Sequence, residues 1–115
     1  MKFTETHEWI ELSKEENNVG IVGVTAFAQK ELGEIVYVEL PQVDKEIKKG
    51  EEVAVLESTK AAADIYSPVS GTIIEINKRL TSQPELINHS PENEGWIFKI
   101  RLSNPKEWDT LLTGN

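Results

Sequence analysis

Short segments rich in Val and Ile recur along the chain, and Gly, Pro and Asn separate them at close intervals. Such segments are typical of strands, and this spacing of turn residues is typical of a small sandwich or barrel. Between residues 80 and 94, prolines and asparagines predict a loop with one helical turn at 84–88. We therefore predict a mostly β protein, with strands at 9–12, 19–24, 34–39, 52–57, 63–66, 71–76 and 96–102.

Helical spacing of apolar residues follows the second of these strands. The pattern predicts a helix over residues 25–32, because Thr25 can cap its amino end and Gly33 can adopt the left-handed conformation beyond its carboxyl end. The apolar residues of this segment, Phe27 among them, are spaced for one buried face.

A second helix is expected over residues 104–112. Asn104 can serve as its N-cap, Pro105 suits the first helical position, and Glu107 can reach back as in a capping box. Apolar residues at spacings of three and four predict that this helix packs on the sheet as a lid. Those residues are Trp108, Leu111 and Leu112.

Composition narrows the class of protein. A chain of 115 residues, 38% hydrophobic and 28% charged, can form one modest core, so a single domain over residues 1–115 is expected. The net charge of −8 disfavours a nucleic acid partner. No apolar run approaches the roughly 20 residues that span a bilayer, so no membrane partner is expected. Without cysteine the chain offers no disulfide, cysteine-ligated zinc or thiol nucleophile.

Side chains suited to catalysis are sparse. His7 and His89 are the only histidines and lie far apart in sequence, which gives little support to a catalytic triad. Gly20 and Gly23 lack the third glycine and the following helix of a dinucleotide site. The sequence therefore favours a protein that is not itself an enzyme and has no metal site.

Carboxylates cluster near the middle of the chain, at Glu46, Glu51, Glu52, Glu57 and Asp64. They can be solvated charge that keeps the protein in solution. They can equally form an acidic surface on which basic partner enzymes dock, since complementary charge raises association rates. The sequence leaves both interpretations open.

Two β-like runs meet at Ser58, Thr59 and Lys60, and small residues follow. This arrangement places Lys60 at or near the tip of a hairpin. A lysine at a tip would project a long, mobile amine away from the domain, open to a modifying enzyme. Position alone does not separate this role from that of an ordinary solvated lysine.

The segment around Lys60 resembles the lipoylation segment of glycine cleavage system H proteins, and the similarity covers nearly the whole chain. Biotin carriers place methionines beside the modified lysine, and lipoyl domains of 2-oxoacid dehydrogenases usually place an aspartate before it. Thr59 and Ala61 fit neither pattern. The segments that carry the resemblance are Glu57-Ser-Thr-Lys-Ala-Ala-Ala-Asp64, Tyr66-Ser-Pro-Val-Ser-Gly71, Thr6-His-Glu-Trp9, Gly23-Val-Thr-Ala-Phe-Ala-Gln29, Leu32-Gly-Glu-Ile-Val-Tyr-Val-Glu-Leu-Pro41, Glu75-Ile-Asn77, Pro84-Glu-Leu-Ile-Asn88 and Gly95-Trp96.

This resemblance implies a hybrid barrel-sandwich of two small antiparallel sheets with short peripheral helices. It also implies that Lys60 carries lipoate in amide linkage, attached by a lipoate-attaching enzyme. The lipoylated chain would take an aminomethyl group from glycine decarboxylase to aminomethyltransferase, and dihydrolipoamide dehydrogenase would reoxidise it. In such a division of labour the cofactor supplies the chemistry and the protein supplies tethering and recognition.

The resemblance further assigns roles to individual residues. Those that would help the attaching enzyme recognise Lys60 are Glu57, Ser58, Thr59 and Ala61, with Gly71 at a following turn. A surface cleft would shield the loaded arm from water and hold its cationic amine near carboxylates. The residues at the matching cleft positions are Glu8, Phe27 and Asp64, although Phe27 can instead be a core residue of the first helix.

Three residues depart from the usual family pattern: Asp44, Thr59 and Glu92 stand where glycine, valine and tyrosine are common. Two alternatives therefore stay open, a lipoyl relay for 2-oxoacid dehydrogenases and an unmodified binding domain. Retention of Glu8 and Asp64 favours the aminomethyl carrier, because a plain relay has no adduct to shield. Met1 lies five residues before Thr6, which leaves no room for a transit peptide, so a bacterial cytoplasm is expected, although a mature mitochondrial form with an added methionine would have the same sequence. A monomer is expected.

Overall fold

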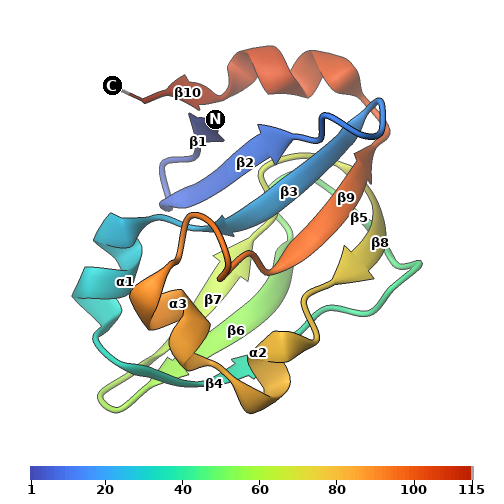
Figure 1. The fold of residues 1–115 in the computed structure, drawn as a ribbon. Helices are drawn as coiled ribbons and strands as arrows, with labels where there is room; N and C mark the ends of the chain where they lie inside the picture. Colours follow the sequence, from blue (N-terminus) through green and yellow to red (C-terminus); the bar gives the residue numbers. More distant parts are fainter. Residues whose placement is uncertain (115) are drawn as a thin grey trace.

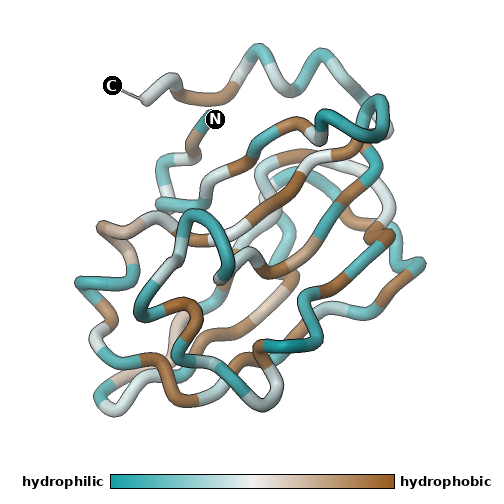
Figure 2. The backbone as a smooth tube through the Cα atoms, viewed as in Figure 1, coloured by the Kyte–Doolittle hydropathy of each residue, from teal (hydrophilic) through white to brown (hydrophobic). Residues whose placement is uncertain are grey.

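Two antiparallel β-sheets enclose the hydrophobic core in the computed structural model, which describes residues 1–114 (Figure 1). The larger sheet has the strand order β10-β1-β2-β3-β9-β8-β5, and the smaller sheet has the order β4-β6-β7. Buried residues of both sheets, such as Ile10 and Leu56, belong to one hydrophobic cluster. Hydrophobic positions recur within the strands, whereas several connecting segments are hydrophilic (Figure 2). The prediction of a mostly β barrel-sandwich is confirmed.

The larger sheet contains three strands of two residues each, which the sequence did not reveal. Segments this short carry no alternating pattern, so only their pairing with neighbours defines them. The strands of this sheet are β1 (Lys2–Phe3), β2 (Glu8–Leu12), β3 (Val19–Val24), β5 (Glu46–Ile47), β8 (Gly71–Ile76), β9 (Phe98–Leu102) and β10 (Leu112–Thr113).

The smaller sheet consists of β4 (Ile35–Glu39), β6 (Glu52–Ser58) and β7 (Ala62–Tyr66). Its register pairs Tyr37 with Glu57 and Glu57 with Ala62. Alternate residues point to opposite faces of a strand, so Leu56 is buried while Glu57 is exposed. The outer face of this sheet, opposite the core, therefore carries polar and charged residues close to the hairpin between β6 and β7.

Short helices lie around the sheets (Figure 1). They are α1 (Ala26–Leu32), α2 (Arg79–Ser82), α3 (Glu85–His89) and the 3₁₀ helix η1 (Pro105–Thr110). The caps of α1 agree with the sequence, since the Thr25 hydroxyl accepts a hydrogen bond from the Ala28 N–H and Gly33 has φ 85°. The helical turn expected at 84–88 is present as α3. Within residues 1–114, no helix is long and apolar enough to cross a membrane.

The predicted helix over residues 104–112 is wrong in type and in length. Residues 105–110 form a 3₁₀ helix, and Leu112 belongs to β10, where it pairs with Phe3 and is 49% exposed. Leu111 is buried as expected. Pairing with β1 at the edge of the sheet outcompetes the continuation of a helix, because it supplies backbone partners that the helical spacing could not indicate.

Glu107 does not form the predicted capping box. Its carboxylate instead accepts hydrogen bonds from the Ser70 N–H at 2.7 Å and from the Ser70 hydroxyl at 3.0 Å. The Asn104 side chain does cap η1, accepting from the Lys106 N–H. Glu107 therefore fastens the carboxyl-terminal segment to the turn that precedes β8.

Candidate modification site

Lys60 lies at the tip of the hairpin between β6 and β7, where the sequence placed it. The Ser58 N–H donates to the Ala61 carbonyl at 2.7 Å and closes the turn. The Ser58 hydroxyl oxygen accepts from the backbone N–H groups of Lys60 at 3.2 Å and Ala61 at 3.0 Å. Thr59, Lys60 and Ala61 are exposed, so the tip combines an ordered backbone with accessible side chains.

The Lys60 side chain turns back over Gly33 instead of pointing away from the protein, which corrects the expectation of a freely projecting amine. A Cβ built on Gly33 would lie 3.1 Å from Lys60 Cε and 3.7 Å from Nζ. The Thr59 N–H also donates to the Glu34 carbonyl at 3.1 Å. The tip therefore rests on the turn between α1 and β4, while Lys60 stays exposed.

Of the residues expected to assist recognition, Glu57, Thr59 and Ala61 are exposed around Lys60. Gly71 is not part of this group. It is buried in β8 and not in a turn, and a Cβ there would lie 2.0 Å from the Arg101 carbonyl oxygen. Gly71 is therefore a packing residue that lets β8 approach β9 closely, and it offers no surface to another protein.

Glu8 is only 1% exposed, and its carboxylate is fully engaged. Oε1 accepts from the hydroxyls of Thr4 and Thr6, the latter at 2.5 Å, and Oε2 accepts from the Tyr66 N–H at 3.1 Å. Glu8 belongs to the larger sheet, and Tyr66 lies in the outer strand of the smaller sheet. The carboxylate thus joins the two sheets, a structural role that the sequence motif did not indicate.

Phe27 is 55% exposed and its ring contacts that of His7 in a tilted arrangement, with ring centroids 4.6 Å apart and the planes inclined by 48°. The interpretation of Phe27 as a core residue is wrong, because α1 lies at the periphery of the sheets and contains no buried residue. Ala28 and Leu32 of α1 are partly buried and pack against the core. Phe27 and Gly33 lie near opposite ends of α1, which at seven residues is about 10 Å long.

Asp64 is exposed on the outer face of the smaller sheet, in register with Val55 and, through it, with Glu39. The negative charge of Asp64 is the main cause that raises the pKa of Glu52 above its ordinary value of 4.5, and partial desolvation and the negative charge of Glu39 add to the shift. The structure thus places Asp64 among acidic neighbours, and its carboxyl group does not share the hydrogen bonds of Glu8.

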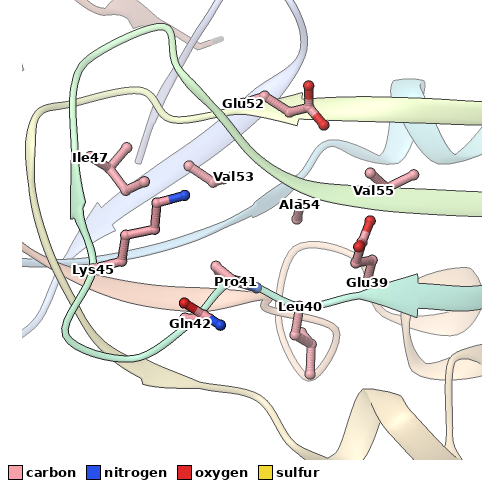
Figure 3. Close-up of a pocket in the computed structure, with 10 residues that line it drawn as sticks. All are labelled: Glu39, Leu40, Pro41, Gln42, Lys45, Ile47, Glu52, Val53, Ala54 and Val55. Atoms are coloured by element: carbon pink, nitrogen blue, oxygen red, sulfur yellow. The ribbon is translucent and has the colours of Figure 1, made fainter.

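A cavity of about 420 Å³ borders this face where β4 ends and β6 begins. Leu40 and Val53 contribute apolar surface, while carboxylates of Glu39 and Glu52 and the amine of Lys45 stand around it (Figure 3). Because Glu52 and Ser58 are opposite ends of β6, the cavity is remote from the Lys60 tip. Among residues 1–114, no group of three or more His, Cys, Asp and Glu could hold a metal ion.

Two of the three departures from the family pattern have structural explanations. Asp44 has φ 74°, a left-handed conformation that glycine favours and aspartate tolerates. Glu92 Oε2 accepts from the Ala26 N–H at 2.8 Å, which places a negative charge at the amino end of α1. The Thr59 side chain is exposed, and nothing in the structure explains the choice of threonine there.

Known proteins resemble this chain in sequence and in fold. Residues 1–115 match the family profile described as Glycine cleavage H-protein. The glycine cleavage system H protein of Thermotoga maritima is 53% identical over 111 residues, covering 96% of this chain and 87% of that protein. The probable glycine cleavage system H protein of Aeropyrum pernix is 54% identical over 113 residues, covering 98% and 77%.

A solved structure extends the similarity to three dimensions. The crystal structure of a glycine cleavage system H protein from Mycobacterium marinum matches with a TM-score of 0.80 and 29% identity, covering 95% of this chain and 94% of that one. The profile spans every residue of the chain, and the relatives exceed half identity over nearly all of it. This chain therefore belongs to the glycine cleavage H-protein family.

Proposed function

We propose that this protein is the lipoyl carrier of a glycine cleavage system, with lipoate in amide linkage on Lys60. The observation that carries the proposal is an exposed lysine on an ordered hairpin tip in a member of this family. When attached, the lipoyl group supplies a dithiolane that accepts the aminomethyl group derived from glycine. The chain itself supplies tethering, orientation and recognition, so partner enzymes carry out the bond-breaking steps.

The residues around Lys60 suit covalent attachment. The exposed amine can enter the active site of another enzyme, and the small side chains of Ala61 and Ala62 leave room for that approach. Ser58 fixes the turn through the backbone. Within this proposal, a lipoate-attaching enzyme recognises the tip through Glu57, Thr59 and Ala61 together with this ordered turn.

Of the three residues expected in the arm-shielding cleft, two stay available to an attached group. Phe27 and Asp64 are exposed, whereas the buried Glu8 carboxylate already accepts three hydrogen bonds. We propose that Glu8 supports the cleft indirectly, by holding Tyr66 and hence β7 against the larger sheet. In this proposal Phe27 and Asp64 contact the attached lipoyl group directly.

The outer face of the smaller sheet suits brief encounters with basic partners. Glu39, Glu57 and Asp64 are exposed there, and the negative charges of Asp64 and Glu39 raise the pKa of Glu52. Complementary charge raises association rates and weakens with salt, as a carrier that visits several enzymes requires. The proposed partners are glycine decarboxylase, aminomethyltransferase and dihydrolipoamide dehydrogenase.

Reconstitution tests this function. The lipoylated protein is mixed with glycine decarboxylase, and exchange of labelled bicarbonate into the carboxyl group of glycine is measured. Exchange that requires the lipoylated chain and is lost with Lys60→Arg supports the proposal. A lipoylated protein that donates to 2-oxoacid dehydrogenases but supports no exchange would indicate the relay, and failure of lipoylation would indicate the unmodified binding domain.

A further inference from the structure

We infer that Asn88 is a positioning residue for modification of Lys60, acting through the α1–β4 corner (residues 33–35). The inference rests on the proposed function, because it concerns the reaction that attaches lipoate. Asn88 lies in α3, far from Lys60 in sequence, and α3 packs beside β4 (Figure 1). Its effect on the hairpin would pass through two sets of contacts.

Asn88 first binds the backbone of Ile35. Its Oδ1 accepts from the Ile35 N–H at 2.8 Å, and its Nδ2 donates to the Ile35 carbonyl at 3.1 Å. The side-chain amide thereby provides both backbone partners that a neighbouring strand would otherwise supply. Gln29 completes the network, since its Nε2 donates to Asn88 Oδ1 at 3.4 Å and to the Gly33 carbonyl at 3.2 Å.

The α1–β4 corner in turn supports three consecutive residues of the hairpin, Ser58, Thr59 and Lys60. Ser58 pairs with Ile35 across the two strands. The Thr59 N–H donates to the Glu34 carbonyl at 3.1 Å, and the Lys60 side chain packs over Gly33.

The strand ladder alone holds this corner poorly. The register between β4 and β6 shifts between Ile35 and Tyr37, so Val36 faces no partner residue on β6. Such an irregularity leaves one residue unpaired and disrupts the ladder locally. The side chain of Asn88 supplies its two hydrogen bonds next to this irregularity, where the backbone pairing is interrupted.

Loss of the Asn88 amide would release the corner and let the tip sample other conformations. The attaching enzyme would then meet the competent tip in a smaller fraction of molecules, which raises KM while the chemical step is unchanged. One net hydrogen bond corresponds to about fivefold in the conformational equilibrium, so KM for Asn88→Ala should rise by up to about fivefold. Asn88→Asp keeps the acceptor for the Ile35 N–H and should raise KM less.

Asn77 provides a matched control. Its Nδ2 donates to the backbone carbonyls of Glu94 at 3.0 Å and Trp96 at 2.8 Å, so Asn77→Ala also removes two hydrogen bonds from a side-chain amide to the backbone. These bonds lie away from the hairpin. Asn88→Ala and Asn77→Ala are compared with wild type in steady-state lipoylation, at a temperature where circular dichroism shows every variant folded.

The inference predicts a raised KM for Asn88→Ala, a kcat within about twofold of wild type, and a KM for Asn77→Ala close to wild type. Equal effects of the two variants, or an unchanged KM for Asn88→Ala, would overturn it. If the alanine variant does not fold, Asn88→Asp takes its place in the same comparison.

Amide hydrogen exchange gives a readout that does not depend on lipoylation. The inference predicts faster exchange of the Thr59 N–H in Asn88→Ala, since that N–H binds the corner at Glu34. Unchanged Thr59 exchange would overturn the positioning role. If wild type accepts no lipoate, the proposed function fails, and the exchange experiment still decides whether Asn88 orders the hairpin.

Discussion

Replacement of Glu8 by alanine tests whether a single carboxylate joins the two sheets. Glu8 is buried in the larger sheet and accepts hydrogen bonds from Thr4, Thr6 and Tyr66. The Tyr66 N–H would lose its acceptor at the outer strand of the smaller sheet. The threonine hydroxyls would also lose this acceptor, although they lie closer to solvent and can turn toward water.

The expected loss of stability follows from these three bonds. A hydrogen bond to a charged group contributes about 1.5 to 3 kcal/mol, and rehydration of the two hydroxyls returns part of the total, so we expect about 3 kcal/mol for Glu8→Ala. In a domain of this size about 1 kcal/mol corresponds to roughly 4 °C, so Tm should fall by about 12 °C. Glu8→Gln keeps an acceptor for the Tyr66 N–H and should cost only about 1 kcal/mol.

Thermal unfolding followed by circular dichroism at pH 7 measures both variants beside wild type. Lipoylation of Glu8→Gln at a temperature where it is folded should match wild type, because the contacts that support Lys60 lie at the α1–β4 corner. A Tm for Glu8→Ala within about 3 °C of wild type, less than the equivalent of 1 kcal/mol, would refute the role of Glu8 in joining the sheets.

Three further perturbations have defined outcomes. Gly33→Ala forces a side chain onto a backbone with φ 85°, so stability should fall by about 1 to 3 kcal/mol in chemical denaturation. Glu107→Ala removes both hydrogen bonds to Ser70 and should lower stability by about 2 kcal/mol, with faster proteolysis near the carboxyl end. Because Asp64 raises the pKa of Glu52 in the folded state, the folded protein binds this proton more tightly, and the associated stability is lost as pH rises above about 4.5. Glu52→Gln should therefore raise Tm at pH 7 and leave it unchanged near pH 4.

Contrary results are equally clear for these variants. A Gly33→Ala protein as stable as wild type would mean that the turn adopts another conformation. Unchanged proteolysis of Glu107→Ala would mean that the carboxyl-terminal segment is held by its pairing with β1 alone. If the Tm gain of Glu52→Gln were the same at pH 4 and pH 7, repulsion from Asp64 would not be its cause.

Local signals in the sequence predicted the larger elements well. The capping residues Thr25 and Gly33 define the ends of α1 because each acts within a few residues of the helix. The tip at Lys60 was also predictable, since two β-like runs flank it in sequence. The short strands β1 and β10 were not, because they exist only through pairing between opposite ends of the chain.

The functional assignments depended on contacts that sequence spacing does not reveal. The hydrogen bond from Tyr66 to Glu8 joins residues 58 positions apart, and those between Asn88 and Ile35 join residues 53 positions apart. The family motif singled out Glu8 but did not indicate that its carboxylate is buried and hydrogen-bonded. It also placed Gly71 in a turn, whereas this glycine permits close approach of two strands.

Lipoylation of Lys60 is the central claim, and intact mass measurement tests it most directly. The purified protein is incubated with a lipoate-attaching enzyme, lipoate and ATP, and peptide sequencing maps any adduct; Lys60→Arg serves as the control. Our account predicts the mass of one lipoyl group in amide linkage, located on Lys60, and no increment in the arginine variant. An unmodified Lys60 under conditions that fully lipoylate another H protein, or an adduct on a different lysine, would contradict it.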